Sequence, residues 1–374
     1  MPYPQFDRRQ VHFKPLTDRP NKKDIEQDQI DPAQTPRPLV ESERMVFAEI
    51  LRRIVTARKN KRPVMLTFGA HTIKNGLAPV LIRLIERGWI THLATNGAGI
   101  IHDWEFAFQG ASSEDVRGNV ARGEFGNWQE TGFNLNLALN LGAFEGCGYG
   151  ESVGRMIAQE GLQIPDPADL DRILISPLPD TPEAFEHRAA AADCRALLQR
   201  FNLKPGWLAI PHPWKSCSIQ ARAFELSVPF TGHPMFGHDI IYNHPMNHGA
   251  SIGRAAERDF LSFAESVTRI QGGVYLSVGS AVMSPMIFEK SFSMAQNVAL
   301  QATGKTIQDL LIVTVDLAQA GWDWTQGEPP ENNPAYYQRF NKSFSRMGGT
   351  LRYLSMDNRD FLLQLVQGLN PQTD

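Results

Sequence analysis

The sequence predicts an α/β fold in which a doubly wound, mostly parallel sheet is flanked by helices. Short apolar runs that are typical of buried strands alternate with longer segments of helical periodicity. Several of the apolar runs also end in glycine or aspartate, as strands do before they leave for a crossover helix. In such sheets the loops that bind ligands gather at the carboxyl ends of the strands.

Composition narrows the function classes. The chain has 374 residues, 42% of them hydrophobic and 21% charged, which is typical of a globular enzyme. A formal net charge of -3 gives no reason to expect nucleic acid as a main partner. No apolar run has the length of a signal peptide or a membrane span, and three distant cysteines form no disulfide framework. We therefore expect a soluble, cytoplasmic protein.

Two regions are expected. Residues 1–40 are polar and rich in proline and bury too little apolar surface to order themselves, so we expect an extended arm that lies on a neighbour or stays mobile. Residues 41–374 show no internal repeat and are expected to form a single α/β catalytic domain.

The first strand–helix–strand unit follows the arm. Apolar residues from 45 to 55 recur at helical spacing and predict an amphipathic helix before the basic run 58–62. Residues 63–69 form a short apolar run that stops at a glycine, which favours a buried strand. A helix over 77–88 and a second buried strand over 89–95 complete the unit. Its connectivity implies a parallel sheet.

The middle of the chain is predicted to be mostly helical. A core run over 135–141 precedes a glycine-rich break, and a helix over 151–159 follows it. The segment 181–201 begins with threonine and proline, which favour the N-cap and first position of a helix. A short helix over 218–224 then leads into a strand over 226–230.

The last third repeats strand and helix. The run 309–315 is the clearest strand in the chain because its apolar residues are nearly continuous. Similar patterns predict helices over 251–270, 288–301 and 360–369 and strands over 273–278 and 350–354.

Chemistry is concentrated in the stretch 227–253. Four of the ten histidines, His233, His238, His244 and His248, surround Asp239. Imidazole and carboxylate are common metal ligands, so a metal site is one interpretation. Ordinary polar loop residues are another. We favour a polar substrate pocket in which Asp239 pairs with a cation and a histidine moves protons.

Three other sites carry weaker signals. Cys217 and His212 are close enough in sequence for a nucleophile pair, although a buried thiol is the favoured interpretation of the cysteine. His71 follows the first strand, where it either contacts a ligand or caps the next helix. Lys342 becomes a candidate for imine chemistry if its aromatic neighbours bury it and lower its pKa.

Several stretches between Pro63 and Phe361 resemble, in order, the deoxyhypusine synthase family. The matching stretches are LTFGAHTIKNGL at 66–77, THLATNGAGIIHDW at 91–104, SIQARAFELSVPF at 218–230, GGVYLSVGSAVM at 272–283 and DLAQAGWDW at 316–324. Lys342 falls at the position of the family's catalytic lysine, and Asp239 falls where the family holds a polyamine. The family's paired acids are replaced here by Ile101 and His102, from which we expect an altered substrate.

The resemblance implies a Rossmann-like fold and a homo-oligomer, dimeric or tetrameric. It also implies an enzyme that uses NAD to transfer an aminoalkyl group from a small amine or polyamine to an amine acceptor through a lysine imine. A metal-dependent enzyme that uses His233, His238, Asp239 and His244, or a non-catalytic binding module, are the alternatives. The expected catalytic residues are Lys342, His233, Asp239 and His244. The expected NAD contacts are Ala70, His71, Asn75, Thr95, Asn96, Gly97, Gly279, Ser280, Asp316, Gln319 and Asp357. The expected substrate contacts are His102, His238, Asp239, Trp322 and Asp323.

Overall fold

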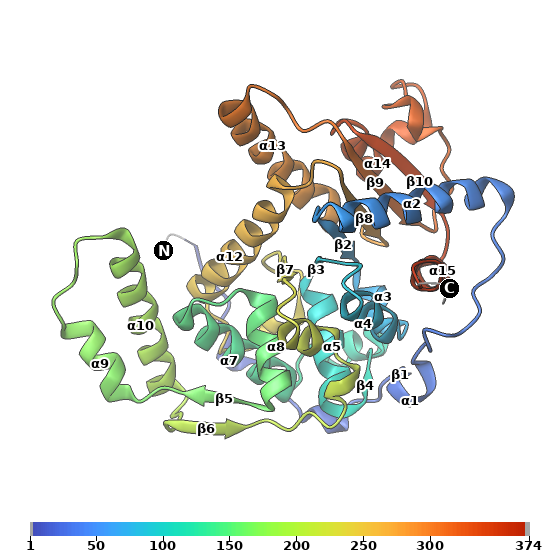
Figure 1. Ribbon diagram of the computed structural model, residues 1–374. Helices are drawn as coiled ribbons and strands as arrows, with labels where there is room; N and C mark the ends of the chain where they lie inside the picture. The colour runs from blue at the N-terminus through green and yellow to red at the C-terminus, as the bar shows by residue number, and fades with distance from the viewer. Residues whose placement is uncertain (1–2, 371–374) are drawn as a thin grey trace.

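A six-stranded parallel sheet forms the centre of the computed structural model, which describes residues 3–370 (Figure 1). Its strands are β2 (Val64–Phe68), β3 (His92–Thr95), β7 (Phe230–Gly232), β8 (Gly273–Val278), β9 (Leu310–Asp316) and β10 (Thr350–Ser355). Each neighbouring pair is parallel, in the order β10-β9-β8-β2-β3-β7. The predicted doubly wound α/β fold is therefore confirmed.

The strand order reverses between β2 and β8. From this point β3 and β7 continue the sheet in one direction, and β9 and β10 continue it in the other. This is the order of Rossmann-like dinucleotide-binding folds, in which ligands bind outside the carboxyl ends of the strands at the reversal. The two strands leave the sheet in contact, because a side chain at Gly69 would collide with the carbonyl oxygen of Gly279.

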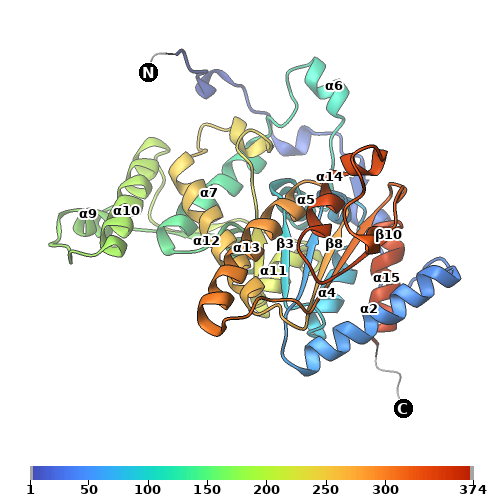
Figure 2. The same ribbon diagram turned by 90° about the horizontal axis from the view of Figure 1, so that it is seen from above.

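Helices cover both faces of the sheet (Figure 2). The helices α2 (Glu41–Lys59), α4 (Ala78–Glu86) and α15 (Asn358–Gly368) share a hydrophobic core with Leu66 and Leu276 of the sheet. Residues of α12 (Gly249–Thr268) and α13 (Met283–Thr303) share a second core with Met65 and Tyr275, which face the opposite side. Because both faces are covered, the strands read as continuous apolar runs, and this is why the sequence predicted most of them.

Four further helices form a second layer beside β3 and β7. They are α5 (Gly97–Gln109), α7 (Gln129–Glu145), α8 (Tyr149–Gln159) and α11 (Ile219–Glu225). A two-stranded ribbon of β5 (Gly161–Ile164) and β6 (Gly206–Ala209) carries α9 (Pro167–Ile175) and α10 (Pro182–Arg200) away from the sheet (Figure 1). The short elements are α1 (Ile25–Asp28), α3 (Ala70–Lys74), α6 (Val116–Ala121), α14 (Arg339–Ser345), β1 (Lys23–Asp24) and β4 (Ala111–Ser112).

Two predictions of secondary structure were wrong. The strand expected over 226–230 begins only at Phe230; residues 226 and 227 form a turn, in which Ser227 has a φ of 54°. Residues 96–99 after β3 contain two glycines that are typical of an exit loop, but they form the cap and first turn of α5. Asn96 caps this helix, since its side chain accepts a hydrogen bond from the Gly99 amide at 3.0 Å.

The N-terminal arm packs against its own chain. Leu16 and Ile25 are buried in the main core, and β1 pairs antiparallel with β4. Arg19 forms an ion pair with Glu105 in which each side chain is only 1% exposed. Few apolar residues suffice to order the arm because backbone pairing and a buried charge hold it as well. Among the described residues, no helix has the length and apolar character of a membrane span.

Candidate functional site

A cavity of about 200 Å³ opens where β3 and β7 end. It lies between the first turns of α5 and the loop that follows β7, and we call it the His102 cavity. Its charged and titratable lining residues are Arg19, Lys74, His102, Glu105, Glu114, His238 and Asp239. The lining therefore combines cations, carboxylates and imidazoles at the edge of the sheet where ligands bind in this fold class.

One face of α5 forms a wall of this cavity. Ala98, Ile101, His102 and Glu105 all line it, and they occur at the three- and four-residue spacing that places side chains on one side of a helix. The N-cap residue Asn96 fixes where the helix begins and hence which residues face the cavity.

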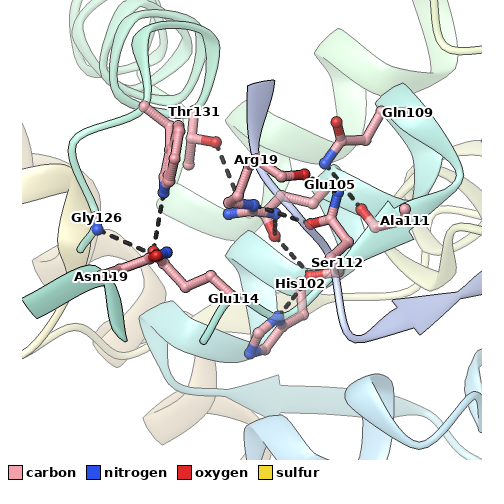
Figure 3. Close-up of polar contacts among 12 residues, drawn as sticks. Arg19, His102, Glu105, Gln109, Ala111, Ser112, Glu114, Asn119, Gly126 and Thr131 are labelled. Carbon is pink, nitrogen blue, oxygen red and sulfur yellow. Dashed lines mark hydrogen bonds and ion pairs between the residues drawn. The ribbon is translucent and has the colours of Figure 1, made fainter. Parts of the chain in front are cut away.

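Glu105 is the centre of a hydrogen-bond network in this wall (Figure 3). Both of its carboxylate oxygens accept from the Arg19 guanidinium, each at 2.7 Å. Ser112 also donates to Glu105 at 2.6 Å, and Thr131 donates at 3.2 Å. Burial acts to raise the pKa of Glu105, but the charge and hydrogen bonds of Arg19 lower that pKa overall. Glu105 is therefore a paired, ionised carboxylate.

His102 extends this network toward the cavity. Its Nδ1 lies 2.7 Å from the Ser112 hydroxyl, while its other ring nitrogen points away from Ser112 (Figure 3). Burial lowers the pKa of His102, so the imidazole is neutral at physiological pH. Glu114, beside it, accepts from Asn119, Trp128 and the Gly126 amide.

Asp239 occupies the opposite wall and is the least satisfied group there. Its carboxylate lies against Gly97, where any side chain would collide with it. One oxygen, Oδ2, is buried and has no hydrogen-bond partner within residues 3–370. Burial raises the pKa of Asp239 to about 7. Asp239 therefore has hydrogen-bonding capacity that the described part of the chain does not use.

Two tyrosine hydroxyls near Asp239 are also unpaired. The hydroxyls of Tyr149 and Tyr242 are buried without a partner in the described part of the chain. Burial raises the pKa of both groups, and the charge on Asp239 raises it further. Lys74 is the complementary group, because it lines the same cavity and makes no side-chain hydrogen bond or ion pair within residues 3–370.

The expected catalytic residues do not converge. Lys342 lies 3.1 Å above the ring centre of Tyr336 and 3.6 Å from Glu328, and it does not line the His102 cavity. His233 lines a separate cavity of about 460 Å³, which is mainly apolar. Its Nε2 lies 2.9 Å from the hydroxyl of Thr231, and burial lowers its pKa to about 3. Of this set, only Asp239 lines the His102 cavity.

His244 is held within the protein interior. Its Nδ1 accepts a hydrogen bond from the Met246 amide at 3.1 Å, and its ring packs edge-on against Phe13 and Phe133. Burial lowers its pKa to about 4. Within residues 3–370, no three histidine, cysteine, aspartate or glutamate residues are placed to hold a metal ion. The four candidate metal ligands of the sequence are therefore not gathered into one site.

The expected NAD contacts all follow the carboxyl ends of sheet strands. Ala70, His71 and Asn75 follow β2, and Thr95, Asn96 and Gly97 end β3 or begin α5. Gly279 and Ser280 follow β8, Asp316 and Gln319 end or follow β9, and Asp357 follows β10. They thus share one edge of the sheet.

The expected substrate contacts divide into two groups. His102, His238 and Asp239 line the His102 cavity. Trp322 and Asp323 instead hold their own loop, the former by donating to the Gly327 carbonyl and the latter by capping a short helical turn.

The possible nucleophile pair is not formed. The His212 ring packs edge-on against Trp104 and Phe108, and its nitrogens have no partner in the described chain. The sequence prediction did not include Arg19, Lys74 or Glu105. Glu105 stands three positions after His102, so prediction of α5 as a helix would have placed both on one face.

No protein-family model matches the chain, and no curated protein matches it, so the family resemblance stays a prediction. Among solved structures, unliganded AgrE aligns over 91% of this chain with 15% identity and a TM-score of 0.44. ArgZ, a cyanobacterial arginine dihydrolase, aligns over 90% with 14% identity and a TM-score of 0.40. A putative LOR/SDH protein of Methanococcus maripaludis aligns over 92% with 12% identity and a TM-score of 0.43.

The chain spans about a third of the AgrE and ArgZ chains, 35% and 34%, and 72% of the LOR/SDH protein. AgrE has also been solved in a ternary complex with ornithine and NAD+, which aligns with 14% identity and a TM-score of 0.43.

The aminoalkyl transfer expected from the sequence is wrong. Lys342 is held by Glu328 and Tyr336 and does not line the His102 cavity, whereas Asp239 does. A lysine imine cannot form on a substrate that Asp239 holds unless the two side chains share a cavity.

Proposed function

We propose that the protein is an oxidoreductase that binds NAD and acts on a small amino acid held in the His102 cavity. One observation carries the proposal. A buried, unpaired carboxylate oxygen of Asp239 and an uncommitted lysine, Lys74, line the same cavity at the carboxyl edge of a Rossmann-ordered sheet.

The carboxyl edge fits a dinucleotide. Gly69 and Gly279 let β2 and β8 leave the sheet in close contact at the point where the strand order reverses, which is where dinucleotides bind in this fold class. The partly exposed carboxylates of Asp316 and Asp357 end β9 and follow β10, where they can accept hydrogen bonds from ribose hydroxyls. The bound nicotinamide would exchange a hydride with the substrate. The turn after β2 has only the first glycine of the G-x-G-x-x-G fingerprint of dinucleotide-binding folds, so other loops must contribute contacts to the dinucleotide.

The charges of the cavity fit a zwitterion. Lys74 supplies a cation for a carboxylate group. Asp239 supplies an anion for an ammonium or guanidinium group. A volume of about 200 Å³ admits a small molecule and excludes a polymer. We infer that the substrate is an amino acid with a short or extended cationic group.

The proposal is tested by binding and turnover with the purified protein. NAD+ binding is measured by calorimetry, and formation of NADH is then followed with a panel of L-amino acids that includes basic side chains. Asp239→Asn should weaken amino acid binding at least about tenfold, because a charge-assisted hydrogen bond is lost, and should leave NAD+ binding unchanged.

The exposed Asp180 offers a matched control, since Asp180→Asn makes the same chemical change far from the cavity. No NAD+ binding, or no turnover of any amino acid in either direction, would reject the proposed function.

A further inference from the structure

The hydrogen-bond network beneath the His102 cavity fixes where the imidazole carries its proton. Glu105 is ionised, as its two bonds from Arg19 require, and a carboxylate can only accept hydrogen bonds. Ser112 therefore donates its single hydroxyl hydrogen to Glu105, 2.6 Å away. That hydrogen is not available to any other partner.

The contact between Ser112 and His102 must then run in the other direction. Ser112 Oγ and His102 Nδ1 are 2.7 Å apart, and the serine has no second hydrogen to give. His102 Nδ1 therefore carries the proton and donates it to the serine oxygen. In the neutral imidazole the second nitrogen, Nε2, is left as a bare acceptor. It points away from Ser112, and the residue lines the cavity (Figure 3).

We infer that His102 is the proton acceptor of this cavity, a catalytic base that Ser112, Glu105 and Arg19 hold in position. The inference rests on the proposed function for its substrate. An ammonium group must lose one proton before its carbon can give up a hydride to oxidised nicotinamide. In this step one N–H bond of the substrate breaks and its electron pair stays on the substrate nitrogen. One N–H bond forms at His102 Nε2.

The same network stabilises the product of that proton transfer. The imidazolium carries a positive charge, and the Glu105 carboxylate lies one hydroxyl away from it. Because the surroundings are largely buried, this charge acts through a low effective dielectric constant. Glu105 and Ser112 do not touch the substrate in this arrangement, so they are positioning residues.

The N-terminal arm completes the network at two points. Arg19 belongs to the arm and neutralises Glu105. Lys23 of β1, also in the arm, is the register partner of Ser112 in β4. The arm thus holds the serine by backbone pairing and the glutamate by charge. The residues that orient His102 therefore come from both expected regions of the chain, the arm over 1–40 and the domain over 41–374.

The position of the proton is measurable by NMR in the full chain. Protein labelled with ¹⁵N at histidine gives multiple-bond ¹H–¹⁵N correlations whose pattern distinguishes the two neutral tautomers, and His102→Gln identifies the His102 signals. We expect the Nδ1–H tautomer in the wild-type protein. Ser112→Ala should transfer population to the Nε2–H tautomer, because the acceptor of the Nδ1 hydrogen is gone.

Thr131→Val is the matched control. Thr131 also donates to Glu105, but to the oxygen that is not bonded to Ser112. Its removal should leave the His102 tautomer unchanged. A wild-type Nε2–H tautomer, or equal responses to the two substitutions, would overturn the inference.

Turnover separates this inference from the proposed function. Where an amino acid is oxidised, His102→Gln should lower kcat by about a hundredfold or more, the usual contribution of a general base, with a smaller change in KM. His187→Gln on the exposed face of α10 is its control. A loss in kcat below about threefold for His102→Gln would remove the base role. Where no amino acid is oxidised, the proposed function fails, and the tautomer result alone decides the inference.

Discussion

The two walls of the His102 cavity differ in whether their buried carboxylates have hydrogen-bond partners. In the α5 wall, the Glu105 carboxylate accepts from Arg19, Ser112 and Thr131. In the facing wall, Asp239 has a buried oxygen with no partner within residues 3–370, and the hydroxyls of Tyr149 and Tyr242, which lie near Asp239 but do not line the cavity, are unpaired there as well. A saturated network fixes geometry, whereas an unsaturated one has binding energy left for a ligand. The α5 wall therefore positions His102, whereas the wall with Asp239 is the one suited to bind a ligand.

Substitution of Glu105 in the saturated wall should have the largest effect on the free energy of unfolding. Glu105→Gln leaves the Arg19 guanidinium buried without a counter-charge, and loss of one partner of a buried pair costs about 3–5 kcal/mol of unfolding free energy. Urea unfolding at neutral pH measures it. Glu41→Gln removes half of an exposed pair with Arg44 and should cost at most about 1 kcal/mol. Similar losses for the two variants would show that the network does not hold the wall.

The stability that the Asp239 wall contributes should depend on pH. The pKa of Asp239 is raised from 3.8 to about 7, so the folded protein binds its proton more tightly than the unfolded chain does. Its contribution to stability is therefore present below pH 4 and is lost as pH rises to about 7.

Asp239→Asn removes this loss. It should unfold like the wild type near pH 4 and be more stable at pH 8, by about 2–4 kcal/mol. Asp259 has a similarly raised pKa, so the difference between variant and wild type is the quantity to measure. Parallel stability curves for the two proteins between pH 4 and pH 8 would contradict the unpaired state of Asp239.

The smallest effect comes from single hydroxyl deletions, where the two walls should differ in sign. Thr131→Val removes a donor to Glu105 and should destabilise the fold by about 1 kcal/mol. Tyr149→Phe removes a buried hydroxyl that has no partner in the described part of the chain and should be neutral or stabilising by up to about 1 kcal/mol. Thermal unfolding measures both. Equal destabilisation by the two deletions would remove the distinction between the walls.

The sequence predicted the sheet better than the site, for physical reasons. Strands such as β8 and β9 are covered on both faces and are therefore continuous apolar runs. The glycines of α5 are typical of a turn, so the helix was missed despite the N-cap signal of Asn96. With α5 missing, Glu105 was not placed beside His102.

The expected catalytic set failed for another reason. His233, Asp239 and His244 lie within twelve positions of one another, but the loop after β7 sends them to separate surroundings. His233 borders the apolar cavity, His244 packs among phenylalanines, and Asp239 lies against Gly97. Proximity in sequence does not fix direction in an irregular loop.

The Arg19–Glu105 pair also bears on the order of folding. The two residues are 86 positions apart, so the arm leaves the ribosome long before the helix that it joins. Until α5 has formed, Arg19 has no buried partner, and closing so long a loop is entropically costly. Docking of the arm therefore depends on α5, and the imidazole of His102 becomes oriented only when both are in place.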